Sequence, residues 1–207
     1  MKKHLFSAII AVWLLVLTIC IIFSSIKPEA ESYSRDVYMH RLESKFNAAR
    51  EDLAIVIDEY IKTVAPNAVL DPLNLIDLSS KYNVDLIFIL AQGHVESHFG
   101  TKGTASRTNS VFNVGAFDGH SAKKQIKNGY GYKHPDHSVE PYLKLLTSNY
   151  LVEKTEFELL ENFVDINAQR YATNTQYESM LQEKYSNIEK CIGEAYSKYK
   201  MYKLQLW

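Results

Sequence analysis

The part of the chain that most restricts its fold is residues 84–99, which read as one helix with almost no polar face. Apolar side chains lie all around this helix: Leu86, Ile87, Ile89, Leu90, Ala91 and Val95. A helix that is apolar on every side is stable in water only when other elements surround it. Gly100 and Gly103 follow and end it. The sequence therefore predicts a mainly helical domain built around this segment.

Glu96 lies near the C-terminal end of this helix, beside a glycine-containing loop. The negative end of the helix dipole and the apolar neighbours Val95 and Phe99 both disfavour a charged carboxylate. We therefore expect the pKa of Glu96 to be raised. A glutamate with a raised pKa keeps its proton near neutral pH and is suited to general acid catalysis.

The N-terminus predicts a membrane anchor. Leu5–Ile26 is a run of 22 residues without a charge, and as a helix it would span roughly 30 Å, the thickness of a bilayer's hydrocarbon core. The run lacks a small-x-small cleavage site, so we expect an uncleaved anchor, with cleavage after about Ser25 as the alternative. Lys2 and Lys3 place residues 1–4 in the cytoplasm and everything after the anchor outside it.

A short polar linker, residues 27–34, leads into a helical pattern over residues 35–64. Its apolar stripe is Leu42, Phe46, Ala49, Leu53, Val56 and Tyr60. So narrow a stripe predicts either a coiled-coil stalk or a helix that packs on the following domain. Asp71 and Pro72 then predict the start of another helix, which ends near Tyr82.

Residues 70–190 are expected to form the main domain, with residues 191–207 as a C-terminal tail. Further helices are expected at residues 140–151, 155–166 and 176–200. Residues 101–137 predict loops or a short β-hairpin. Four lysines without an acid lie in this loop region, either as a basic lip for an anionic polymer or as a solvated loop: Lys123, Lys124, Lys127 and Lys133.

Net charge and cysteine content give no support for a nucleic-acid partner or for a disulfide. The formal net charge of -1 gives no indication of a nucleic-acid partner. The chain has two cysteines, Cys20 inside the expected anchor and Cys191 near the C-terminus. Because these lie in different environments, we expect no disulfide, and the domain must be stable through its core alone.

Three ordered blocks resemble a known signature. They are Ala91-Gln92 to Gly100 with Asn109–Val114, then Ser138–Leu146, then Arg170–Leu181. Together they resemble bacterial and phage peptidoglycan N-acetylglucosaminidases of the flagellar-muramidase-like glucosaminidase family, within the lysozyme-like superfamily. The resemblance implies a lysozyme-like α+β fold, mainly α with a loop-rich or hairpin flank. It also implies a cofactor-free enzyme that cleaves β-1,4 bonds in the glycan strands of peptidoglycan outside the cytoplasm.

The resemblance also implies roles for individual residues. Glu96 matches the general acid, and Tyr171 matches the tyrosine that faces it across the groove. The residues expected at the sugar site are Gln92, Ser97, Asn109, Phe112, Asn113 and Asp118. Asn113 stands where glycine is common in the family, and Phe112 can equally be a core aromatic residue that fixes the loop.

The chain departs from the family in its second acid. Asp118, Asp136 and Glu140 occupy the relevant region, but none stands in the family's context; Asp118 is typical of a turn and Glu140 of a first helical turn. Glycoside hydrolysis ordinarily uses two carboxylates. Three alternatives therefore stay open: a lytic transglycosylase using the same glutamate, a route assisted by the substrate's N-acetyl group, and a non-catalytic peptidoglycan-binding or assembly module.

His94 and His98 are four residues apart and share a helix face, as in zinc-binding helices. Glu96 lies two residues from each, roughly 200° around the helix, and so points away from a metal held there. We therefore expect structural or groove-lining histidines and no metal site.

Overall fold

The computed structural model describes residue 18 and residues 35–115 and 121–206. The chain divides into two compact units, Met1–Asn47 with Tyr202–Trp207, and Ala48–Met201. The predicted anchor at residues 5–26, apart from Thr18, and the linker at residues 27–34 lie outside the described residues. In the part that is described, no helix has both the length and the apolar character needed to cross a membrane. In the first unit, residues 35–47 and 202–206 are helical.

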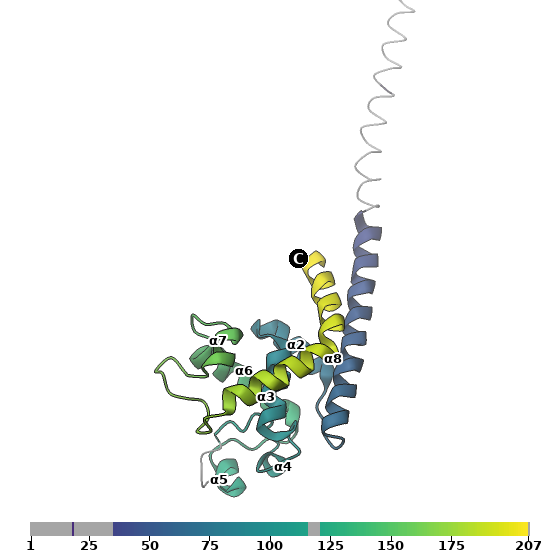
Figure 1. Ribbon diagram of the computed structural model, residues 1–207. Coiled ribbons are helices and arrows are strands. Elements are labelled where there is room, and N and C mark those ends of the chain that lie inside the picture. Colours follow the sequence, from purple (N-terminus) through teal and green to yellow (C-terminus); the bar gives the residue numbers. More distant parts are fainter. Residues whose placement is uncertain (1–17, 19–34, 116–120, 207) are drawn as a thin grey trace, which may run out of the picture. The chain divides into compact units, whose positions relative to one another are not determined.

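The second unit is helical, as predicted (Figure 1). Its described residues contain no strand, and Val164 and Arg170 form an isolated antiparallel bridge. The short β-hairpin that was one alternative for residues 101–137 is absent from the described part of that region, which forms short helices instead. After the helical residues 48–64, the elements are α2 (Pro72–Tyr82), α3 (Leu86–Ser97), α4 (Ala105–Thr108), α5 (Ala122–Lys127), the 3-10 helix η1 (Pro135–Ser138), α6 (Val139–Leu145), the π-helix η2 (Leu146–Tyr150), α7 (Glu156–Glu161) and α8 (Tyr177–Leu206).

The predicted buried helix is α3. Every residue from Leu86 to His94 is buried. Asp85 caps its N-terminus, since its side chain accepts a hydrogen bond from the backbone N–H of Phe88 at 3.0 Å. The helix ends at Ser97, and the next residue, His98, caps it with a left-handed φ of 47°. It therefore ends shortly before Phe99, the predicted last residue.

Residues 48–64 pack on the rest of the second unit. Arg50 forms an ion pair of 2.6 Å with Asp77 of α2. The most buried side chains are spaced four apart: Ala49, Leu53, Ile57 and Ile61, all at 0–1 % exposure. The predicted stripe was thus wrong in its second half, where Ile57 and Ile61 face the core and Val56 and Tyr60 lie at its edge.

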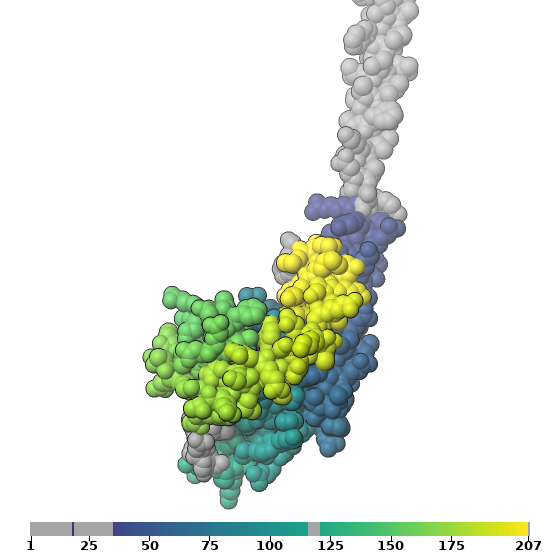
Figure 2. Space-filling view, in the orientation of Figure 1, coloured from purple at the N-terminus to yellow at the C-terminus, as the bar shows by residue number. Residues whose placement is uncertain are grey.

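Two later helices differ in length from the prediction. Helix α7 covers Glu156–Glu161, because Thr155 and Glu158 form a capping box at its start and Asn162 has extended backbone at its end. Helix α8 is longer than predicted and continues to Leu206, so most of the expected tail at residues 191–207 belongs to it. Figure 2 shows the yellow-green part of α8 at the surface of the second unit, beside the green segment that precedes it.

Candidate active site

Two side chains reach the carboxyl group of Glu96 in the last turn of α3. The hydroxyl of Tyr177, the first residue of α8, donates to Glu96 Oε1 at 2.5 Å. Asn113 Nδ2 lies 3.3 Å from Glu96 Oε2 and donates to the backbone oxygen of Glu96 at 2.7 Å. Each carboxyl oxygen therefore faces a hydrogen-bond donor, and Oε1 is held by the shorter bond.

The loop that carries Asn113 is fixed to the end of α3. Ser97 Oγ donates to the backbone oxygen of Val111 at 2.6 Å and accepts from the N–H of Gly100 at 2.7 Å. Asn113 has a left-handed φ of 49°, which glycine adopts freely and asparagine tolerates. This backbone requirement explains why asparagine can stand where glycine is common, and only asparagine adds an amide that reaches Glu96.

Tyr171 contacts this loop rather than Glu96. Its hydroxyl donates to the backbone oxygen of Phe112 at 3.0 Å. The ring of Phe112 is 1 % exposed and stacks on Tyr142 with centroids 3.8 Å apart. Phe112 thus lies in the core, where it fixes the loop, and the partly exposed Tyr171 ring lies 5.6 Å from the ring of Tyr177.

Burial raises the pKa of Glu96, and the hydrogen bonds from Tyr177 and Asn113 partly offset this. The direction agrees with the expectation from sequence. Three phenols surround the carboxyl group, and burial together with the nearby Glu96 holds the pKa of each well above its ordinary value: Tyr142, Tyr171 and Tyr177. These tyrosines therefore stay protonated, while Glu96 is the group that titrates. Tyr177 donates to Glu96 and Tyr171 to the backbone oxygen of Phe112, whereas the Tyr142 hydroxyl has no hydrogen-bond partner in the described structure.

The raised pKa of Glu96 has a measurable effect on stability. A carboxyl whose pKa is higher in the folded than in the unfolded state stabilises the fold below about pH 4.3, and this contribution is lost as pH rises through the folded-state pKa. Glu96→Gln does not titrate. The melting temperature of the variant minus that of the wild type should therefore increase from pH 4 to pH 8 in thermal unfolding. A difference that stays constant over this range would contradict the raised pKa.

The other predicted site residues have structural partners. Gln92 is 0 % exposed and donates from Nε2 to the Tyr177 hydroxyl at 2.9 Å. Asn109 has a left-handed φ of 54° and donates to the backbone oxygen of Tyr132 at 2.8 Å. Asp118 lies outside the described residues. Sequence reasoning missed Tyr177 as a partner of Glu96, although it lies only six residues after Tyr171 in the third sequence block.

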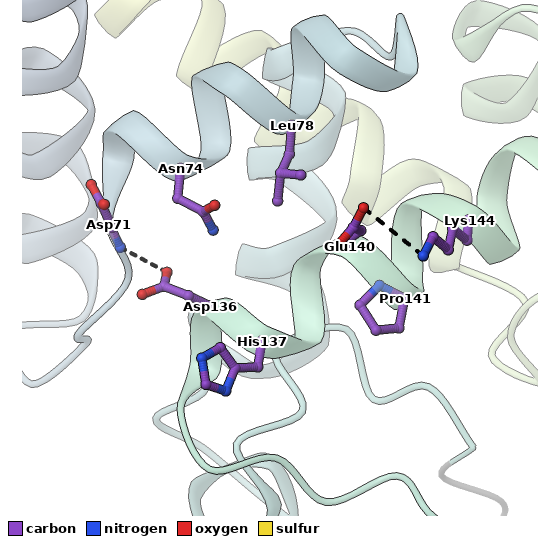
Figure 3. A pocket seen from close by; sticks show the side chains of 8 residues that line it. All are labelled: Asp71, Asn74, Leu78, Asp136, His137, Glu140, Pro141 and Lys144. Carbon is purple, nitrogen blue, oxygen red and sulfur yellow. Dashed lines mark hydrogen bonds and ion pairs between the residues drawn. The ribbon is translucent and has the colours of Figure 1, made fainter.

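Asp136 and Glu140, considered as second acids, line a different groove of about 520 Å³ between α2 and the η1–α6 segment (Figure 3). Its lining is Asp71, Asn74, Leu78, Asp136, His137, Glu140, Pro141 and Lys144. Asp136 accepts from the N–H of Asp71 at 2.9 Å. Lys81 and Tyr82 bond to Glu140 at 2.7 and 2.8 Å and lower its pKa. The lining of this groove does not include Glu96, so the structure gives neither acid support as its counterpart.

His94 has a structural environment. Its Nδ1 lies 2.7 Å from the Tyr60 hydroxyl, and burial, with His98 nearby, lowers the pKa of His94 to about 4. Across the residues that the structure describes, no group of three or more His, Cys, Asp or Glu side chains is arranged to hold a metal. The four lysines of the predicted basic lip are exposed on α5 and in the loop after it, and within the described chain none forms an ion pair.

A helical domain with a buried glutamate of raised pKa at the end of its central helix, beside buried tyrosines, is compatible with a glycosidase. The family model for glucosaminidases, described as mannosyl-glycoprotein endo-beta-N-acetylglucosaminidase, matches residues 73–190. This match covers more than half of the 207 residues. The chain therefore belongs to the glucosaminidase family, as its sequence blocks indicated. A comparison with curated proteins found no match.

Proposed function

We propose that the chain is a peptidoglycan glycosidase of the N-acetylglucosaminidase type, with Glu96 as its general acid. The observation that carries the proposal is the hydrogen-bonded carboxyl of Glu96, whose pKa is raised by burial, in a domain of the glucosaminidase family. Glu96 as a residue is partly exposed. We propose that a substrate oxygen approaches the carboxyl group from this exposed side of the residue.

In the proposed reaction Glu96 protonates the oxygen of the leaving sugar as the glycosidic bond breaks, so that this sugar leaves as a neutral alcohol. A water molecule forms the new bond to the anomeric carbon and loses a proton, which returns Glu96 to its neutral form. The carboxylate that remains accepts hydrogen bonds from Tyr177 and from the more distant amide of Asn113. These donors stabilise the charge that the step leaves on Glu96. Tyr171, a partly exposed residue whose ring stacks on Phe163, is the proposed aromatic contact for the sugar.

A lytic transglycosylase remains the second candidate. In that reaction the same glutamate protonates the leaving oxygen and then assists attack by the sugar's own hydroxyl. The observation that favours it is the placement of Asp136 and Glu140, which are bonded to other residues and line a groove that does not include Glu96. Assistance by the N-acetyl group is equally compatible with a single acid.

We also propose that residues 5–26 anchor the protein with the domain outside the cytoplasm, because peptidoglycan lies there. The uncharged run after two lysines supports this. Fractionation of cells that make the full chain should find it in the membrane fraction and degraded by protease added from outside the cytoplasm. Recovery in the soluble cytoplasmic fraction would contradict the proposal.

The first experiment is a zymogram. The full chain should clear a gel that contains peptidoglycan, and Glu96→Gln should not. If neither protein clears the gel but both sediment with purified sacculi, the chain is a binding or assembly module and the enzymatic proposal fails.

A further inference from the structure

Behind Tyr177 lies a buried amide that the proposed chemistry does not use. Gln92 is one turn before Glu96 on α3 and is 0 % exposed. Its Nε2 donates to the Tyr177 hydroxyl at 2.9 Å, and the Tyr177 hydroxyl donates to Glu96 Oε1 at 2.5 Å. The three side chains form one hydrogen-bonded chain that runs from the core to the carboxyl group.

The two hydrogen bonds that join Gln92, Tyr177 and Glu96 have a fixed donor-to-acceptor direction. The Tyr177 hydroxyl has a single proton, and its oxygen already accepts a bond from Gln92. The proton is therefore directed at Glu96 Oε1, which must act as an acceptor. Oε2 is then the oxygen that can carry the proton of the neutral acid, and its Asn113 contact is longer, at 3.3 Å.

We propose that Gln92 is a positioning residue that directs the Tyr177 hydroxyl toward Glu96 Oε1, so that the transferable proton of Glu96 resides on Oε2. This inference rests on the proposed function, because it assigns the oxygen from which Glu96 protonates the substrate. Gln92 does not touch the substrate and acts through Tyr177.

The surroundings of Gln92 support a role other than stability. In the described structure its Oε1 is buried and has no hydrogen-bond partner. A half-satisfied buried amide is unfavourable, so an apolar residue of similar shape is expected to be tolerated here. The titratable groups that face Glu96 are Tyr142 of α6, Tyr171 of the preceding loop and Tyr177 of α8. All three stay protonated near neutral pH, so they add no competing titration.

Gln92→Met tests the direction of the chain. Without the amide, the Tyr177 hydroxyl is free to turn, donates less to the carboxylate and can accept a proton from Oε1. We expect the pKa of Glu96 to rise by about half a unit or more, with the alkaline limb of the kcat/KM profile moving by the same amount and kcat falling several-fold. The opposite case has the Gln92 amide turned so that its oxygen accepts the proton of the Tyr177 hydroxyl. That hydroxyl would then point away from Glu96, and Gln92→Met would leave the pKa of Glu96 unchanged or lower it. Either result overturns the proposal.

Two controls separate positioning from packing. Leu90→Met changes a buried side chain of the same helix, 1 % exposed, and should leave the pKa of Glu96 unchanged. In a Tyr177→Phe background, Gln92→Met should have no further effect on the pKa of Glu96, because the hydroxyl that links Gln92 to Glu96 is absent. An equal shift with and without the Tyr177 hydroxyl would mean that Gln92 acts through packing, and the proposal would fail.

The pKa of Glu96 can be followed without activity, by carbon-13 NMR of the side-chain carboxyl in the full chain, with Glu96→Gln to assign the signal. If no form of the protein cleaves peptidoglycan, the proposed function fails, yet the NMR titrations still decide whether Gln92 directs Tyr177. If the wild type cleaves and the titration of Gln92→Met matches its own, only the role of Gln92 is refuted.

Discussion

Glu96→Gln is expected to lower kcat/KM on peptidoglycan by about 10³-fold, because a positioned general acid contributes on the order of 10² to 10⁴ in rate. Glutamine has nearly the same shape, and its amide oxygen can still accept the Tyr177 hydrogen bond that Glu96 Oε1 accepts. It has no acidic proton that it can transfer to the leaving oxygen. The measurement is the release of new reducing ends from purified peptidoglycan, with sacculus binding and thermal unfolding checked for the same protein.

Glu140→Gln is the matched control for this experiment. Glu140 is one of the acids considered as a second carboxylate, and its side chain is bonded to Lys81 and Tyr82. Removing its charge should leave activity within about two-fold, since exposed ion pairs contribute little to stability. A loss with Glu140→Gln as large as with Glu96→Gln would identify Glu140 as the second carboxylate. Near-normal activity in Glu96→Gln would remove Glu96 from the mechanism.

Tyr177→Phe should have the second largest effect, a loss of kcat of roughly 10- to 100-fold, which corresponds to one hydrogen bond to a charged group. The aromatic ring stays and packing is kept, while Glu96 Oε1 loses its shortest bond. Since that bond lowers the pKa of Glu96, its removal should move the alkaline limb of the pH–rate profile to higher pH. The measurement is kcat and kcat/KM from pH 4 to pH 9.

Tyr171→Phe provides the comparison for Tyr177→Phe. The Tyr171 hydroxyl donates to the backbone of Phe112 and not to Glu96, so its loss can lower activity through the loop or the substrate but should leave the alkaline limb in place. If instead Tyr171→Phe shifts the limb and Tyr177→Phe does not, the two tyrosines have been assigned the wrong roles.

The parts of the fold that could be predicted from sequence are those set by local signals. The apolar run that forms α3 is stable only when it is buried, so the sequence predicts its place in the core. Asp71 before Pro72 predicts the start of α2, where the Asp71 side chain accepts a hydrogen bond of 2.9 Å from the N–H of Leu73. The raised pKa of Glu96 was predicted from its place at the end of an apolar helix, both visible along the chain. Its role as general acid was predicted from the resemblance of the three sequence blocks to the glucosaminidase family.

The contacts around Glu96 could not be predicted, because they join distant segments. Tyr177 lies 81 residues from Glu96 in the chain, and both tyrosines of the third block are plausible partners until the fold places one of them. The end of α7 is also set by tertiary packing. The apolar pattern continues past Asn162, but the backbone of Phe163 bonds instead to Tyr171 and to the Glu178 side chain.

The central claim is tested most directly by mass spectrometry of the glycan ends that the full chain produces from purified peptidoglycan. A glucosaminidase that uses Glu96 should generate new reducing N-acetylglucosamine ends with the wild type and none with Glu96→Gln. New ends that are 1,6-anhydro sugars or reducing N-acetylmuramic acid would contradict the N-acetylglucosaminidase type. New ends of any kind that persist in Glu96→Gln would contradict the assignment of the acid.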